Sequence, residues 1–509
     1  MNISMNRELS VPIYQQIKMQ IQSQIWNGSL QAGSKLPPER KLAEQLGVNR
    51  STVLRAYQEL KAEGWVNAVV GRGTIVEERS EWSKALQRSR LHSASVVPQA
   101  FLRNPPLERD LIKELLSMPA GPDHYSFALG KPAAACMPVE RLQSHLAGIT
   151  TEQGHRLFQH CPTHGYAPLR ETVSKWMQGR GAADAAVEEV LIVSGAQQGL
   201  DLVARVMIEQ GDIVFVEEPT YFSAVQLFRL YGARIMTMPS DGRGGLQLDF
   251  LEAMLMKHAP KFIYVQPTFQ NPTGRVLSFQ QRKGLMELAE RYGTYIVEED
   301  PYYELRYSGE TIPALKSMDA AGQVIYIGSY SKLLSPGLRV GWVYAPAEIT
   351  DAMARWKQYM DLHSSPINQA LIDSFIRSGD MERHLAMCRQ YYKRNRDDMA
   401  VFLQAYERYG WSFRLPEGGF FLWLRLPEEL SATVLLLRAM EKEVSFAPGA
   451  YFSFDGRQEY RSCIRLNFSW PLRSQMEEGL ARLHALSSGM LEEQRGSARP
   501  GRSYHLPFV

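Results

Sequence analysis

The chain has 509 residues, of which 45% are hydrophobic and 22% are charged, as expected of a soluble protein with more than one domain. We expect a cytoplasmic protein without a membrane segment, because no secretory signal opens the chain and no apolar run approaches the roughly 18 residues that span a bilayer. The four cysteines are far apart and the 11 histidines do not cluster, so neither a disulfide framework nor a metal site is predicted.

The formal net charge of +3 is distributed unevenly along the chain. Residues 1–76 carry nine Lys and Arg against five Glu and no Asp, which makes this segment +4 and the rest of the chain −1. This asymmetry indicates an anionic partner for the amino-terminal module.

The first 77 residues have the pattern of a small helical module with a β-hairpin. Isoleucines four residues apart predict an amphipathic helix with one buried face: Ile13, Ile17, Ile21 and Ile25. Two more helices are predicted over 38–46 and 50–60, and apolar runs on both sides of 71–73 predict the hairpin. This order is typical of a winged helix-turn-helix, whose recognition helix enters the DNA major groove. The alternative is a module used for dimerisation or packing.

Three motifs in this module carry a family resemblance. Leu-Pro-Pro-Glu-Arg-Lys-Leu-Ala at 36–43, Arg-Ser-Thr-Val at 50–53 and Gly-Arg-Gly at 71–73 resemble the winged-helix domain of the GntR superfamily. The resemblance implies that residues 1–77 bind double-stranded operator DNA through Arg40, Arg50, Ser51, Thr52, Arg72 and Gly73. We expect Arg40 mainly to contact phosphate and the residues near Arg50 to read base edges.

Two segments of the chain lack the periodicity of regular structure. Residues 78–108 carry Ser, Arg, Pro and Asn and are predicted to be a linker that permits many placements of the modules. The alternative is a short docked helix over 82–91. Residues 488–509 are polar and are predicted to be a disordered tail.

Residues 109–487 alternate strand-like and helix-like runs, which predicts an α/β domain with a mostly parallel sheet. Polar motifs follow three of its apolar runs: Asn271-Pro-Thr-Gly, Asp300-Pro-Tyr-Tyr and Ser329-Tyr-Ser-Lys332. Each motif alone is explained as a turn or a surface loop. Because open α/β sheets bind ligands at the carboxyl ends of their strands, the three together predict one shared site. Lys332 supplies an amine for imine chemistry, and the helix start at 195–199 suits a phosphate.

This ordered set, with Pro-Gly-Leu-Arg339-x-Gly after the lysine, resembles the aminotransferase class I and II family of fold type I pyridoxal phosphate (PLP) proteins. The resemblance implies a large sheet domain, a small carboxyl-terminal subdomain and a Schiff base between PLP and Lys332. It also implies the residues that hold the ring: Asp300 at the pyridine nitrogen, Asn271 and Tyr303 at the phenolic oxygen, and Tyr221 on its face. The implied phosphate contacts are Gly195, Ala196, Gln197, Ser329 and Arg339.

Two further assignments come from the same resemblance. Tyr166 matches a tyrosine that reaches the phosphate of the neighbouring subunit's cofactor, which implies a homodimer. Arg465 and the loop at Gly130 match the positions that hold the α-carboxylate of an amino acid, and a planar guanidinium suits a carboxylate.

The whole chain resembles the MocR (GabR-like) subfamily of regulators, in which a GntR-type winged helix is joined by a linker to an aminotransferase-like domain. The resemblance implies a transcriptional regulator that responds to PLP, alone or with an amino acid or amine. One alternative is an active PLP-dependent aminotransferase with an accessory DNA-binding domain. Another is a module that senses PLP itself.

Overall fold

A computed structural model describes residues 3, 12–26, 29–62, 65–69, 73–77, 124–182, 185–240, 245–454 and 458–497. The chain divides into two compact units. One comprises Met1–Pro105, Glu428–Glu443 and Leu486–Val509, and the other comprises Pro106–Pro427 and Val444–Ala485. The predicted linker at 78–108, the alternative helix at 82–91 and Arg72 lie outside the described residues.

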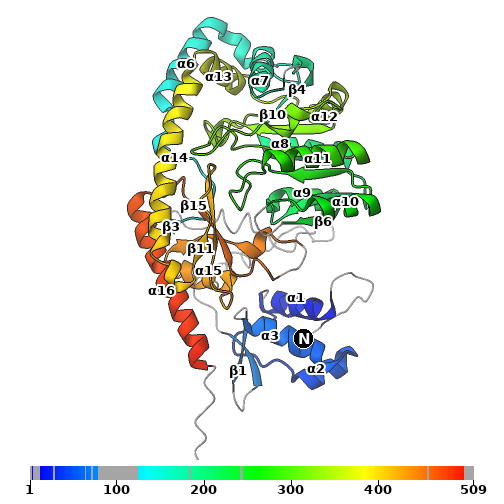
Figure 1. The fold of residues 1–509 in the computed structure, drawn as a ribbon, viewed down its shortest axis with the longest axis vertical. Coiled ribbons are helices and arrows are strands. Elements are labelled where there is room, and N and C mark those ends of the chain that lie inside the picture. The colour runs from blue at the N-terminus through cyan, green and yellow to red at the C-terminus, as the bar shows by residue number, and fades with distance from the viewer. Residues whose placement is uncertain are drawn as a thin grey trace, which may run out of the picture. The chain divides into compact units, whose positions relative to one another are not determined.

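The amino-terminal region contains three helices and a hairpin (Figure 1): α1 (Ile13–Trp26), α2 (Glu39–Leu46), α3 (Arg50–Ala62), β1 (Val66–Val69) and β2 (Gly73–Val76). Gly47 ends α2 in the left-handed conformation, with φ of 61°, and so starts the short turn into α3. The predicted isoleucine face forms the core of this region together with Val53, Tyr57 and Leu60. The predicted helix-turn-helix is therefore confirmed.

A seven-stranded sheet forms the centre of the larger unit, in the order β4-β10-β9-β8-β7-β5-β6. All neighbours pair in parallel except β10, which is antiparallel to both β4 and β9. The mostly parallel sheet is thus confirmed. The strands are β4 (Val190–Val193), β5 (Ile213–Glu218), β6 (Arg234–Pro239), β7 (Phe262–Val265), β8 (Tyr295–Glu299), β9 (Val324–Ser329) and β10 (Gly341–Tyr344).

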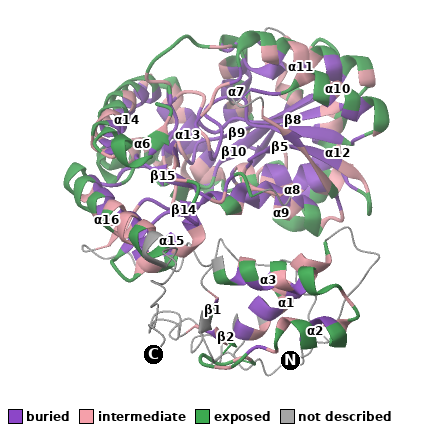
Figure 2. Cartoon of the chain, turned by 60° about the horizontal axis from the view of Figure 1, so that its bottom comes forward, coloured by how far each residue is buried: buried purple, intermediate pink, exposed green. Residues whose placement is uncertain are grey.

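Helices cover this sheet, and its strands lie buried in Figure 2. Neighbouring residues along a strand enter different cores: Val297 packs in one apolar cluster and Ile296 in another. Burial on both faces explains why these strands read as continuous apolar runs. The helices are α7 (Ala167–Gly179), α8 (Ala196–Met207), α9 (Phe222–Leu230), α10 (Leu248–Lys257), α11 (Phe279–Tyr292) and α12 (Ala347–Met360).

A second, antiparallel sheet of four strands has the order β11-β12-β15-β14, as expected for a smaller carboxyl-terminal subdomain. Its strands are β11 (Ser412–Phe413), β12 (Phe421–Arg425), β14 (Ala447–Pro448) and β15 (Cys463–Asn467), and a separate parallel pair consists of β3 (Tyr125–Ser126) and β13 (Val444–Ser445). The remaining α-helices are α6 (Val139–Gln153), α13 (Pro366–Arg377), α14 (Asp380–Gln404), α15 (Ala432–Met440) and α16 (Arg473–Ser497).

Helix α16 differs from the sequence prediction, which placed a disordered tail from residue 488 onward. The helix continues to Ser497, and Met490 is buried within that stretch. Met490 and Leu491 are the only large apolar side chains in residues 488–497, which is too weak a pattern to predict a helix by periodicity. None of the described helices combines the length and the apolar run that crossing a bilayer requires.

Candidate functional site

Lys332 lies three residues beyond the carboxyl end of β9, where the sequence placed it. Its Nζ donates a hydrogen bond to the carbonyl oxygen of Gly130, over 2.6 Å. Burial and the nearby guanidinium of Arg465 lower the pKa of Lys332 to about 8. A substantial fraction of this amine is therefore neutral near pH 7.5, which is the form that attacks a carbonyl carbon.

Gly130 is held against the small subdomain. A Cβ atom at this position would lie 2.5 Å from the Phe421 ring, so only glycine lets the loop approach this closely. The structure therefore brings together Gly130 and Lys332, as the sequence predicted.

An anion cradle forms at the start of α8. Gly195 precedes the helix with φ of 86°, and no side chain caps its first turn at Ala196 and Gln197. The Arg339 guanidinium lies against this turn, because a Cβ at Gly195 would be 2.6 Å from its Nη2. Arg339 donates only to neutral oxygens, including Ser194 O over 2.9 Å, and forms no ion pair with any described carboxylate. A helix start and an unpaired guanidinium together suit a phosphate.

Ser329 joins this cradle through its neighbours. The Ser331 amide donates to Ser329 Oγ over 3.2 Å, and Arg339 Nη1 donates to Ser331 Oγ over 3.3 Å. The five predicted phosphate contacts of the chain's own loops therefore lie together.

The carboxylate on the face of Lys332 is Glu299, not Asp300. Successive residues of a strand point to opposite faces of a sheet, and β8 ends at Glu299. Glu299 Oε2 accepts hydrogen bonds from the Tyr264 hydroxyl and from Gln266 Nε2, the latter over 2.7 Å. The charge of Lys332 acts on Glu299, although burial still raises the pKa of that carboxyl above its usual range.

Asp300 faces the other side of the sheet. The charges that act on it are those of Glu298, Arg180, Arg282 and Glu304, and neither of its buried carboxyl oxygens has a hydrogen-bond partner among the described residues. Burial and Glu298 raise its pKa to about 8. The structure thus does not bring Asp300 to Lys332, contrary to the expectation that Asp300 lies at the pyridine nitrogen of the cofactor.

The two consecutive tyrosines separate in the same way. Tyr302 is buried, and the charges that act on its hydroxyl are those of Arg465, Tyr221 and Glu299. Tyr303 is half-buried, and its ring centroid is 4.5 Å from the guanidinium carbon of Arg180. The structure therefore brings Tyr302, and not Tyr303, to the site. An acid-x-x-Tyr spacing occurs twice, one residue apart, so the spacing itself offered both pairs.

Arg465, on β15, forms the end of the site that suits a carboxylate. Its guanidinium donates to Asn271 Oδ1 over 2.7 Å and to Ala128 O over 2.5 Å, and lies 4.1 Å from the centroid of the Phe421 ring. Its buried Nε has no hydrogen-bond partner in the part of the chain that the structure describes, and burial lowers the pKa of the Arg465 guanidinium to about 10. No described carboxylate pairs with it. A buried guanidinium without a counter-ion is a strong attractor for a ligand carboxylate.

Two predicted aromatic residues differ in their placement. Tyr221 precedes α9, and the charges of Glu299 and Arg465 act on its hydroxyl, so it belongs to the site. The Tyr166 hydroxyl instead donates to Gln153 Oε1 of the same chain over 3.1 Å, and no described contact joins it to Lys332. This placement is compatible with the expectation that Tyr166 serves a neighbouring subunit.

The predicted DNA contacts that the structure describes lie on three elements: Arg40 on α2, Arg50, Ser51 and Thr52 in the first turn of α3, and Gly73 at the start of β2. Arg40, Arg50, Ser51 and Gly73 are exposed and Thr52 is half-buried. Arg50, the first residue of α3, pairs with Glu39 over 3.3 Å. The exposed start of α3 therefore carries one basic side chain, Arg50, whose charge is balanced by Glu39.

The fold and the site define an α/β protein in which a lysine of lowered pKa lies between a helix start that suits a phosphate and a guanidinium that suits a carboxylate. The family described as "Aminotransferase class I and II" matches residues 132–483, and the family described as "Bacterial regulatory proteins, gntR family" matches residues 13–76. The chain belongs to the aminotransferase class I and II family and carries a GntR-type helix-turn-helix region at its amino end.

Relatives of two kinds match the chain. The 2-aminoadipate transaminase of Thermus thermophilus is 38% identical over 388 residues, which cover 76% of this chain and 95% of that protein. The probable rhizopine catabolism regulatory protein MocR of Rhizobium meliloti is 27% identical over 504 residues, which cover 97% of this chain and 99% of that protein. The crystal structure of a multiple substrate aminotransferase from Thermococcus profundus has a TM-score of 0.72 and 34% identity, over 78% of this chain and 99% of that one.

The two kinds of relative differ in which part of the chain they match. The transaminase matches the aminotransferase-like domain, whereas MocR matches both regions. A GntR-type DNA-binding region fused to an aminotransferase-like domain is the architecture of MocR-type regulators, and the interpretation as a regulator fits the full length of the chain.

Members of the aminotransferase class I and II family use PLP, and three features of this structure fit that group. The uncapped start of α8 with Arg339 offers donors for a phosphate. Lys332 has the lowered pKa of an amine that attacks an aldehyde. Among the described residues no donor reaches Glu299 Oε1, because both of its partners use Oε2, so that oxygen is available to a protonated ring nitrogen.

Proposed function

We propose that this protein is a DNA-binding transcriptional regulator whose aminotransferase-like domain binds PLP on Lys332 and senses PLP or an amino compound. The observation that carries the proposal is the set of charges around Lys332. The guanidinium groups of Arg339 and Arg465, which pair with none of the described carboxylates, both act on this amine. Such a site accepts a phosphate at one end and a carboxylate at the other.

In this proposal the chain's own residues hold the cofactor as follows. Gly195, Ala196, Gln197, Ser329 and Arg339 would bind its phosphate, and Glu299 would accept a hydrogen bond from its ring nitrogen in place of Asp300. Tyr302, in place of Tyr303, and Asn271 would bind the phenolic oxygen, and Tyr221 would contact the ring. When bound, PLP supplies an aldehyde for an amine and a ring that accepts electrons.

Arg465 and the loop at Gly130 would bind the carboxylate of an amino acid effector. Because Arg465 already bonds Asn271 and Ala128 O, an incoming carboxylate meets a fixed guanidinium. Lys332, which donates to the Gly130 carbonyl oxygen, would couple the occupancy of the site to the position of this loop. An effector shifts an equilibrium only if it binds one of two states more tightly than the other. In this proposal the two states differ in the contact between Lys332 and the Gly130 loop.

We further propose a homodimer in the bacterial cytoplasm, bound to an operator with two half-sites. Large apolar side chains are exposed on α12 and just after it: Trp356, Tyr359 and Leu362, with Tyr359 88% exposed. A patch of this kind favours contact with another subunit. Sedimentation of the wild type and of a Trp356→Glu, Tyr359→Glu variant tests the dimer, and a variant that sediments as the wild type would contradict this location of the interface.

The regulator proposal is tested with an operator that the protein itself selects from random duplexes. We expect PLP, alone or with one of a panel of amino acids, to change the operator affinity or footprint of the wild type. The same additions should leave Lys332→Ala unchanged. If no addition changes the wild type, effector control of either kind is refuted. If the Lys332→Ala variant responds equally, control does not act through this lysine.

The competing function is an active aminotransferase with an accessory DNA-binding region. The observation that favours it is that Lys332, Glu299 and Arg465 share one site, together with the identity to transaminases reported above. Steady-state assays with amino and oxo acids distinguish the two functions. Slow single half-reactions are compatible with a sensor, whereas rapid multiple turnover by the free protein would favour the enzyme.

A further inference from the structure

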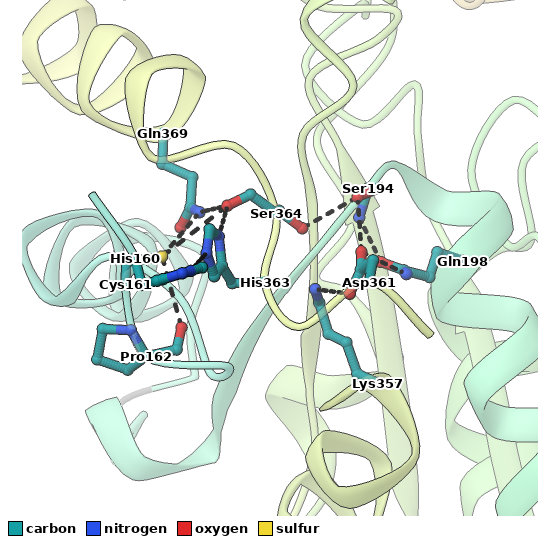
Figure 3. A network of polar contacts seen from close by, with 10 residues as sticks. All are labelled: His160, Cys161, Pro162, Ser194, Gln198, Lys357, Asp361, His363, Ser364 and Gln369. Atoms are coloured by element: carbon teal, nitrogen blue, oxygen red, sulfur yellow. Dashed lines mark hydrogen bonds and ion pairs between the residues drawn. The ribbon is translucent and has the colours of Figure 1, made fainter. Parts of the chain in front are cut away.

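A polar network surrounds Ser194, the residue that precedes the anion cradle at the start of α8 (Figure 3). Asp361, just after α12, accepts hydrogen bonds through Oδ2 from Gln198 Nε2 over 2.9 Å and from Ser194 Oγ over 3.3 Å. The Ser194 amide donates to Gln198 Oε1 over 2.7 Å. Asp361 therefore fixes the orientation of the Gln198 amide, because a carboxylate accepts only from its NH₂ group.

The orientation of the Gln198 side chain determines which backbone N–H groups at the start of α8 remain available to a ligand. The Gln198 carbonyl satisfies the Ser194 amide, and the following amides of Ala196 and Gln197 have no side-chain cap. These two N–H groups are among those that a helix start leaves for an anion. The network thus prepares the first turn of α8 for a phosphate.

Asp361 also brings a negative charge next to the phosphate site. A phosphate at the start of α8 would lie beside Ser194 and Gln198, whose side chains both hydrogen-bond this carboxylate, and like charges repel. Its counter-charge is Lys357 on α12, whose Nζ is 2.7 Å from Asp361 Oδ1 and whose side chain is fully buried. Burial lowers the pKa of Lys357. The Asp361 side chain remains 29% exposed, so the lysine is the buried member of the pair.

The same network extends to the segment that carries Tyr166. Ser364 Oγ is 3.1 Å from Ser194 Oγ, and Gln369 Nε2 donates to Ser364 O over 2.8 Å. Gln369 Oε1 accepts from the Tyr166 amide over 2.7 Å. The cradle and Tyr166 are thus connected through one chain of hydrogen bonds.

We propose that Lys357 and Asp361 are positioning residues that set the preference of this site for a phosphate-bearing ligand. Asp361 orients the first turn of α8, and Lys357 cancels the charge that would otherwise repel the phosphate. The inference rests on the proposed PLP site. Neither residue is placed in contact with the ligand, so their effect is specific to its phosphate and not to its aldehyde or ring.

The test compares the dissociation constants of PLP and pyridoxal, which lacks the phosphate, for the full chain freed of cofactor. Lys357→Met leaves Asp361 uncompensated, and we expect it to weaken PLP binding about tenfold while pyridoxal changes less than about threefold. Asp361→Asn keeps an acceptor for Gln198 and removes the charge, so PLP should bind more tightly relative to pyridoxal. The double variant should return to within about threefold of the wild-type ratio, because it carries no net charge change.

A matched control is available in the Lys316–Asp319 pair, another buried lysine in a short ion pair, over 2.9 Å. Lys316→Met should lower the melting temperature without changing the PLP to pyridoxal ratio. The proposal is overturned if Lys357→Met weakens both ligands equally, or if the double variant fails to restore the ratio. If Lys357→Met does not fold, an unchanged ratio in Asp361→Asn overturns it. If the wild type does not bind PLP at Lys332, the proposed function itself is refuted. If the wild type binds PLP more tightly than pyridoxal and the variants have the same ratio of dissociation constants, only this inference is refuted.

Discussion

Adjacent residues at the end of β8 give opposite predictions for the binding of PLP. Glu299 faces Lys332 and keeps one oxygen without a donor, whereas the Asp300 carboxyl lies on the other side of the sheet and has no hydrogen-bond partner, in both cases among the described residues. We therefore expect Glu299→Gln to impair cofactor binding and Asp300→Asn to leave it nearly unchanged. The two variants are a matched pair, because each replaces a buried carboxylate by its amide.

The magnitude follows from the interaction that Glu299→Gln removes. A hydrogen bond to a charged group contributes about 1.5–3 kcal/mol, so PLP should bind roughly 10- to 150-fold more weakly. The donors Tyr264 and Gln266 remain in place and still meet an acceptor in the amide, so the fold should persist. Asp300→Asn should change the dissociation constant by less than about threefold.

Asp300→Asn has its own readout in stability. Burial and Glu298 raise the pKa of Asp300 to about 8 in the folded chain, above its unfolded value of about 4. The folded state thus binds the proton more tightly, and the wild type should lose stability as the pH rises from about 4 to about 8. Asp300→Asn removes this titration, so the difference in melting temperature between variant and wild type should grow in favour of the variant with rising pH.

The assay is titration of each cofactor-free variant with PLP, followed by its visible absorbance, beside thermal melts at pH 5, 6.5 and 8. The assignment of the two faces predicts a large loss of affinity for Glu299→Gln alone. If Asp300→Asn loses affinity and Glu299→Gln does not, the register of β8 at this edge is refuted.

Three further predictions concern the site and the DNA-binding region. The rate at which PLP attaches to the wild type should rise with pH through about 8, because the pKa of Lys332 is about 8 and only its neutral amine reacts; a stopped-flow pH series checks this, and a midpoint near 10 would contradict it. Arg465→Lys should weaken an amino acid effector roughly 10- to 150-fold while PLP binding changes little, as effector titrations of the PLP-loaded protein would measure. Arg50→Ala should weaken operator binding by about 1–3 kcal/mol if the arginine reads a base. If the arginine contacts phosphate, the slope of the logarithm of affinity against the logarithm of salt concentration should fall by about 1. A binding isotherm that is unchanged across a salt series would show that Arg50 is not in the interface.

Sequence patterns predicted the parts of this fold that depend on local periodicity. The isoleucine periodicity of α1 and the turn at Gly47 both lie within a short stretch of sequence, so the helix-turn-helix could be predicted from local patterns. The apolar runs before Ser329 and Asn271 likewise mark buried parallel strands, since such strands are covered on both faces. The position of Lys332 after β9 follows from that pattern.

The choice between Glu299 and Asp300 could not be made in this way. Both residues follow the same apolar run, and which of them faces the ligand depends on where the strand's alternation ends, a matter of one residue. The same uncertainty applies to Tyr302 and Tyr303. Both Glu299–Tyr302 and Asp300–Tyr303 fit the acid-x-x-Tyr spacing, so the motif could not distinguish between the two pairs. Pairing with β9 fixes the register, because Glu299 lies opposite Ile327, and a single strand does not contain that information.

The Lys357–Asp361 pair shows another limit. Its i, i+4 spacing is visible in the sequence and is typical of an ordinary ion pair on the surface of a helix. Its relation to Ser194 and Gln198 arises only when the end of α12 meets the start of α8, more than 150 residues away in the chain. Contacts of this range depend on tertiary packing, which local patterns do not specify.

Reduction of the protein with borohydride in the presence of PLP, followed by peptide mass mapping, tests the central claim most directly. The account predicts one reduced adduct, on the peptide that contains Lys332, and its loss in Lys332→Ala. An adduct on another lysine, or an equal yield of adduct in Lys332→Ala, would contradict the account.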